Sequence, residues 1–93
     1  MQLLCDFCGS SSPAWAYPAA DFEMGHGHIS HGAWCACDAC AALIDSEARC
    51  QLVDRVASVY QAPAPIRELL ADAYRLFFSH RTGPRRPAML EVN

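Results

Sequence analysis

The chain of 93 residues contains no lysine, and residues 1–48 contain neither lysine nor arginine. It also lacks an apolar run long enough to cross a membrane. The first residues show no basic stretch, apolar stretch or cleavage site of an export signal. We therefore expect a cytoplasmic protein without a membrane partner. In that compartment glutathione keeps thiols reduced, so clustered cysteines bind a metal more often than they form disulfides.

Familiar catalytic patterns are missing as well. The sequence shows no paired catalytic carboxylates, no glycine-rich phosphate loop and no serine–histidine–aspartate arrangement that rises above chance. We therefore expect no enzymatic activity and no small-molecule substrate. With 53% hydrophobic and 18% charged residues, the chain is too apolar to be disordered. Such a short chain buries only about 60% of its unfolded surface, so we expect an additional stabilising element.

Six cysteines provide that element. Four of them form the pairs Cys5-x-x-Cys8 and Cys37-x-x-Cys40, which are separated by 28 residues. The turn inside each pair directs both sulfurs to one point, and two such pairs supply four thiolates for a tetrahedral Zn²⁺. The spacing therefore predicts one structural zinc ion. Four thiolates leave no open position on the metal, which also speaks against an enzyme.

Two iron sites are the alternatives to zinc. A rubredoxin-like site favours a glycine turn after each pair, whereas Ala41 and Ala42 follow the second pair and continue a helix. A [2Fe–2S] cluster that uses Cys35, Cys37 and Cys40 agrees with the spacing, and the colour of the protein would distinguish it. We interpret Cys35 as a packed thiol, with replacement of Cys37 as the less favoured alternative.

Three histidines, His26, His28 and His31, lie in the glycine-containing stretch between the cysteine pairs. We interpret this stretch as a polar loop tip, and a second metal site is the alternative. The remaining cysteine, Cys50, is interpreted as an apolar residue on a helix face. Aromatic residues of the first half are expected to form the core around the metal rather than a stacking surface for nucleotides.

Short strands are predicted around Trp15–Tyr17 and over residues 32–36, where they pair as a loose hairpin. A helix is predicted to begin within a residue of Cys37. A second helix, or a continuation of the first past a break near Asp45-Ser46, runs to about Tyr60. A further helix spans residues 65–80, with a proline in its first turn. We divide the chain into a zinc-binding module at 1–47, a helical extension at 48–80 and a basic, flexible tail at 81–93.

Residues 5–9 (CDFCG) and 34–44 (WCACDACAALI), with Pro13 and Trp15 between them, resemble a group of small, largely uncharacterised treble-clef zinc proteins of bacteria and phages. The resemblance covers about the first 55 residues, and Arg49, Leu52 and Arg55 look like residues of the helix that follows in that group. It implies a structural zinc and a cytoplasmic location, but no activity. The fold class that we predict is a small α+β zinc-binding domain: a treble clef of knuckle, hairpin and helix, followed by one or two helices.

The apolar stripe of helix 65–80 is large for so small a core. We therefore predict that Tyr74, Phe77 and Phe78 contact a partner, either another protein or a second copy of the chain. The function that we predict is a non-enzymatic, zinc-stabilised module for protein–protein interaction, with a regulatory role.

The distribution of charge along the chain indicates an alternative function. The first 48 residues hold six acids, whereas residues 49–93 hold all seven arginines and carry a balance of +3. We therefore expect the two halves to face different partners. A transcription-linked regulator would contact nucleic acid weakly, with a log–log salt slope of about −3, through four arginines of the second half: Arg75, Arg81, Arg85 and Arg86.

Overall fold

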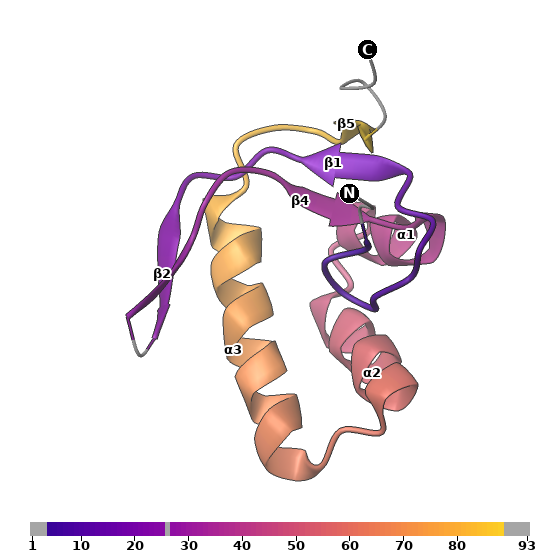
Figure 1. The fold of residues 1–93 in the computed structure, drawn as a ribbon, viewed down its shortest axis with the longest axis vertical. Helices are drawn as coiled ribbons and strands as arrows, with labels where there is room; N and C mark the ends of the chain where they lie inside the picture. The colour runs from indigo at the N-terminus through magenta and orange to yellow at the C-terminus, as the bar shows by residue number, and fades with distance from the viewer. Residues whose placement is uncertain (1–3, 26, 89–93) are drawn as a thin grey trace.

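The computed structural model describes residues 4–25 and 27–88 of the chain. In chain order its elements are β1 (Trp15–Tyr17), β2 (Phe22–Gly25), β3 (His28–Ser30), β4 (Trp34–Ala36), α1 (Asp38–Asp45), α2 (Arg49–Tyr60), α3 (Ala64–His80) and β5 (Arg86–Pro87). In the view of Figure 1, α2 and α3 lie side by side below β1, β4 and β5, and a turn at the bottom joins the two helices. The chain is therefore a small α+β protein, as the sequence predicts.

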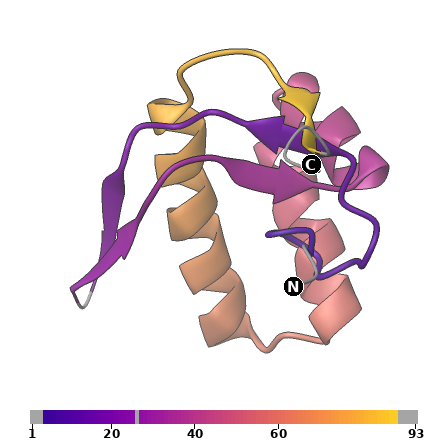
Figure 2. The ribbon, with the colours of Figure 1, turned by 45° about the horizontal axis from the view of Figure 1, so that its top comes forward.

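The strands β1 and β4 pair antiparallel, with Trp15 opposite Ala36 and Tyr17 opposite Trp34. This confirms the predicted pairing of the two short strands. β5 adds to the other edge of β1, so the sheet has the order β4-β1-β5. In the tilted view of Figure 2, β1 and β4 pass in front of α3 and α2. Since β4 leads directly into α1, the sheet sets the position of the second cysteine pair.

The connection between the paired strands contains a hairpin of its own. β2 pairs antiparallel with β3, and the register shifts between Glu23 and Gly25. Gly27 has a φ of 79°, a backbone conformation that glycine adopts without strain. The sequence by itself predicts only a polar loop here, because its glycines and histidines obscure the short apolar alternation of the hairpin.

The helices begin and end close to their predicted boundaries. α1 starts at Asp38, with Cys37 as its N-cap residue. α2 ends at Tyr60, where Gln61 takes a left-handed φ of 52°. α3 carries a proline in its first turn, where the missing N–H is not needed. The predicted helix at 65–80 is thus confirmed, with one further residue at its start.

Aromatic rings form the core that joins these elements. The Phe7 ring lies 5.3 Å from the ring of Trp34, 5.2 Å from that of Tyr74 and 5.2 Å from that of Phe77. Phe7 belongs to the N-terminal loop, whereas its partners come from β4 and α3. One residue of the cysteine-bearing loop therefore reaches the centre of the core. Of the four aromatic residues of the first half that are expected to form the core, Trp15 is half-buried and three are buried: Tyr17, Phe22 and Trp34.

The prediction of a flexible tail from residue 81 is wrong over residues 81–88. Arg81 forms a β-bridge with Ala19, and the Ala88 amide donates to the Ala14 carbonyl at 3.0 Å. The cause is pairing over a long sequence distance: β1 has a free edge in the first half of the chain, and residues 86–87 cover it. Residues 89–93 lie outside the described part of the chain.

Among residues 4–25 and 27–88, no helix combines the length and the apolar character that crossing a membrane requires.

Candidate metal centre

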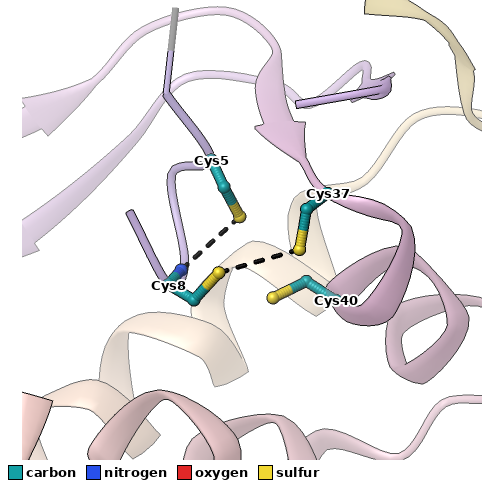
Figure 3. A group of neighbouring side chains, drawn as sticks. All are labelled: Cys5, Cys8, Cys37 and Cys40. Carbon is teal, nitrogen blue, oxygen red and sulfur yellow. Dashed lines mark hydrogen bonds between the residues drawn. The ribbon is translucent and has the colours of Figure 1, made fainter. Parts of the chain in front are cut away.

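The sulfur atoms of Cys5, Cys8, Cys37 and Cys40 lie within 4.8 Å of one another (Figure 3). The sulfurs of Cys8 and Cys37 are 3.7 Å apart. Two sulfurs bound to one zinc ion at tetrahedral positions would be about 3.8 Å apart. All four side chains are buried, with exposed fractions of 3%, 7%, 7% and 0%. The four sulfurs therefore fit a single, tetrahedrally bound metal ion, and their chemistry is consistent with zinc.

A tight turn shapes the first cysteine pair. The Cys5 amide donates to the Ser10 carbonyl at 2.8 Å, and the Gly9 amide donates to the Cys5 carbonyl at 3.0 Å. Gly9 has a φ of 78°, so the backbone turns back directly after Cys8. The Cys8 amide donates to the Cys5 sulfur at 3.4 Å. The turn thus brings both sulfurs to one side and gives one of them a hydrogen-bond donor.

The second pair lies at the start of α1. Cys37 precedes the helix in an extended conformation, and Cys40 lies in its first turn. The Ala41 amide donates to the Cys37 carbonyl at 2.8 Å, which closes that turn. Because the N-terminal end of a helix carries partial positive charge, this position favours the thiolate form of both cysteines.

Two hydrogen bonds join the first knuckle to β4. The Asp6 amide donates to the Cys35 carbonyl at 2.8 Å, and the Cys35 amide donates to the Asp6 carboxylate at 2.6 Å. The Cys35 sulfur is not among the four clustered sulfurs. The geometry therefore favours Cys37 as the ligand, and it gives no support to an iron–sulfur cluster held by Cys35.

The four clustered thiols cannot all ionise easily, because a negative charge on one sulfur disfavours ionisation of its neighbours. A hydrogen bond from Cys40 lowers the pKa of Cys5 to about 4. The same hydrogen bond, together with burial, raises the pKa of Cys40, and burial raises the pKa of Cys8. A divalent cation relieves this effect, since each thiolate gains a positive partner at the same point.

Arg55 is the residue whose role the sequence analysis missed. Its Nε donates to the Cys40 sulfur at 3.4 Å, and its Nη2 lies 3.8 Å from the sulfurs of both Cys8 and Cys37. The hydrogen bond to Cys40 contributes most to raising the pKa of Arg55 above its ordinary value. A signal was present in the sequence, because Arg55 interrupts the stripe formed by the apolar residues Leu52 and Val56.

The other cysteine and the histidines lie apart from this cluster. Cys50 is exposed on α2 rather than packed against the core. His31 Nδ1 lies 2.9 Å from the Asp21 carboxylate, and His28 is exposed on β3. His26 falls outside the described residues. In the described part of the chain, the four cysteines are the group arranged to hold a metal, and a second metal site has no support.

The arginines predicted to contact phosphate are mostly paired with carboxylates. Arg75 lies 3.8 Å from Asp72, Arg81 lies 3.6 Å from Glu47, and Arg85 lies 3.3 Å from Asp45. Arg86 is exposed on β5. Residues 81–88 thus fold back onto the acidic half, where Arg81 and Arg85 each pair with one of its carboxylates.

The predicted partner-binding residues occupy the core. Tyr74 is 3% exposed and Phe77 is 0% exposed, and Phe78 is half-buried, with its ring 5.7 Å from that of Phe77. The prediction that Tyr74 and Phe77 contact a partner is therefore wrong. The apolar stripe of α3 appeared too large for the core because the sequence did not show that Phe7 packs against it.

Comparison with protein-family models, with curated proteins and with solved structures finds no match to this chain. The treble-clef resemblance therefore stays a prediction, and the functional argument depends on the four cysteines and their surroundings.

Proposed function

We propose that this chain is a non-catalytic module for protein–protein interaction, stabilised by one zinc ion in a treble-clef arrangement. The observation that carries the proposal is the buried group of four cysteine sulfurs. Catalytic zinc sites use three protein ligands and keep a position open for water or substrate, whereas four thiolates complete a structural site. A structural metal here would connect the N-terminal loop to α1.

The structural role is supported by where the ligands come from. Cys5 and Cys8 lie in a loop that has no strand or helix of its own, and Cys37 and Cys40 lie at a helix start. Zinc, when bound, supplies free energy of folding because an unfolded chain offers no preformed site. It would thereby hold Phe7 in the aromatic core.

An apolar corner supports the interaction role. Four large apolar side chains around the turn between α2 and α3 are solvent-exposed: Val59 (52%), Tyr60 (57%), Ile66 (45%) and Leu69 (59%). Figure 1 places this turn at the bottom of the two helices, opposite β1, β4 and β5. We call these four residues the apolar corner. These four residues are near one another along the chain, and exposed large apolar side chains are candidates for contact with another protein.

A second copy of the chain is the occupant that we propose for the apolar corner. Arg67 on α3 and Asp54 on α2 form an ion pair close to this corner. Two copies related by a twofold axis would place the same surface of each chain against the other, so that their apolar corners would cover each other.

Sedimentation velocity of the zinc-loaded chain tests the interaction. We expect a dimer that dissociates on dilution between millimolar and micromolar concentration. Leu69→Glu places a charge in the corner and should give a monomer with an unchanged circular dichroism spectrum. The control is Ala42→Glu, at an exposed position of α1, and it should dimerise like the unmodified chain. A monomer at every concentration, or a dimer of the Leu69→Glu variant, would overturn the proposal.

Metal content tests the zinc site independently. Native mass spectrometry of the purified chain should show one zinc ion per molecule. A colourless protein with this mass excludes the iron alternatives, whereas bound iron, or a chain that keeps no metal, would show that the zinc assignment is wrong.

A further inference from the structure

Each of the four clustered sulfurs lies near an N–H donor. The guanidinium of Arg55 supplies the donors for three of them, at 3.4 Å for Cys40 and at 3.8 Å for both Cys8 and Cys37. The fourth sulfur, that of Cys5, accepts from the Cys8 amide at 3.4 Å. One side chain from α2 thus contacts ligands of both cysteine pairs.

The chemistry of arginine suits this position. Four thiolates with one divalent ion retain two negative charges, and those charges are buried here. The guanidinium offsets one of them and stays charged at any ordinary pH. Its planar fork presents several donors at once, whereas a lysine ammonium is a compact point charge that cannot reach three separate sulfurs in the same way.

The helix that carries Arg55 is firmly packed. Leu52 and Val56, on either side of Arg55 along α2, are fully buried. The guanidinium therefore approaches the sulfurs from a rigid support. Contacts between Arg55 and the sulfurs also connect α2, which belongs to the helical extension, to ligands in the N-terminal loop and α1.

We propose that Arg55 is a positioning residue of the metal centre: it orients the ligand sulfurs, offsets their charge, and couples metal binding to the docking of α2. The inference rests on the proposed metal site but goes beyond it, because the four cysteines alone would complete the coordination. Residues that hydrogen-bond to metal ligands typically change metal affinity by about 10–100-fold when they are replaced.

The experiment is a competition for Zn²⁺ and for Co²⁺ between the full chain and a chromophoric chelator. Arg55→Gln should weaken the binding of both ions by about 10-fold or more. The matched control is Arg49→Gln, which removes an exposed arginine from the first turn of the same helix and should bind both ions like the unmodified chain. Arg55→Lys keeps the positive charge but lacks the planar guanidinium. Its affinity for the two ions should lie between those of Arg55→Gln and Arg49→Gln.

The absorption spectrum of the Co²⁺ form separates this role from a purely structural one. Hydrogen bonds to sulfur lower the energy of its lone pairs, so their loss in Arg55→Gln should move the thiolate-to-cobalt charge-transfer bands to longer wavelength. A shift to longer wavelength is therefore the expected sign of lost hydrogen bonds, and unchanged bands would indicate that Arg55 does not act on the sulfurs. Arg55→Lys, which retains the positive charge, provides the same readout if Arg55→Gln does not fold.

The outcomes distinguish this inference from the proposed function. If the unmodified chain binds neither ion, the assignment of the four cysteines as a metal site is wrong. If it binds them, and Arg55→Gln or Arg55→Lys matches Arg49→Gln in affinity and in spectrum, the four cysteines suffice and the role of Arg55 is overturned.

Discussion

The Phe7 ring meets the Phe77 ring edge to face, with their centroids 5.2 Å apart. Phe7 lies between the two cysteines of the N-terminal knuckle, and Phe77 lies on α3. This contact is a direct apolar link between the metal centre and the helical extension. The two parts that the sequence suggested as separate modules therefore share one core, and a change in either should affect the other.

The first prediction concerns that link. Phe7→Ala removes a ring that is 2% exposed and contacts three other aromatic side chains. We expect it to lower the free energy of unfolding by about 3–5 kcal/mol, measured by urea denaturation of the metal-loaded chain. Phe7→Leu keeps part of the volume and should cost less. Equal stability of Phe7→Ala and the unmodified chain would show that the core does not depend on this ring.

The second prediction concerns the metal ligands. Cys8→Ser or Cys40→Ser, or treatment with a chelator, should lower the melting temperature by at least about 10 °C, because the site contributes folding free energy directly. Thermal unfolding followed by circular dichroism measures the change. Cys50→Ser is the matched control, since Cys50 is exposed and outside the cluster. If the cysteine variants and the control melt alike, the metal does not stabilise the fold.

The third prediction concerns alkaline pH. Burial raises the pKa of Tyr17, with its hydrogen bond to Asp45 as the next cause, and burial likewise raises the pKa of Tyr74. A raised pKa in the folded state favours the protonated phenol. Its contribution to stability is therefore complete below the ordinary tyrosine pKa of about 10 and is lost as the pH rises through the folded-state value.

A spectrophotometric titration at 295 nm checks this prediction. Two of the three tyrosines should ionise only together with alkaline unfolding, and Tyr17→Phe should reduce that late group to one. Ionisation of all three tyrosines near pH 10 while the fold persists would contradict it.

Much of the fold follows from local patterns in the sequence. The apolar positions of residues 65–80 recur at the helical period, and the proline near their start suits a first helical turn. The spacing of the cysteine pairs is enough to predict the metal site, because a two-residue gap brings both sulfurs of a pair to one metal ion. These features depend on neighbours within a few residues, so the sequence suffices to predict them.

Contacts across long sequence distances could not be predicted in this way. The pairing of β5 with β1 joins Arg86 to Ala16, 70 positions earlier in the chain. The position of Arg55 beside the sulfurs likewise depends on how α2 packs on α1, and helical periodicity does not specify packing angles. For the same reason, the sequence suggested free arginines in a tail whose charges are in fact largely paired.

The fourth prediction tests that folded-back segment. Arg85 lies 4.0 Å from the centre of the Trp15 ring and pairs with Asp45 at 3.3 Å. Arg85→Ala should lower the free energy of unfolding by about 1 kcal/mol, since both contacts are partly exposed. Arg86→Ala, on the exposed strand next to it, should change stability by less than about 0.5 kcal/mol. Equal effects of the two variants in urea denaturation would mean that Arg85 makes no specific contact.

The last prediction concerns the turn that shapes the first knuckle. An ideal β-carbon on Gly9 would lie 2.3 Å from the Tyr60 hydroxyl oxygen, and Gly9 has a φ of 78°. Tyr60 is exposed and its tip can rotate away, so the backbone conformation should dominate the cost. We expect Gly9→Ala to lower the free energy of unfolding by about 1–2 kcal/mol. Since the clash is minor, the cost should be the same within about 0.5 kcal/mol in a Tyr60→Phe background.

Urea denaturation of Gly9→Ala, Tyr60→Phe and the double variant separates the two causes. Gly9→Asn adds a β-carbon too, but asparagine tolerates the left-handed conformation better than alanine, so it should cost less than Gly9→Ala. If the cost of Gly9→Ala disappears when Tyr60 loses its hydroxyl, the contact and not the backbone is what requires glycine. Metal affinity should weaken along with stability, because this turn holds Cys5 and Cys8 in place for the metal.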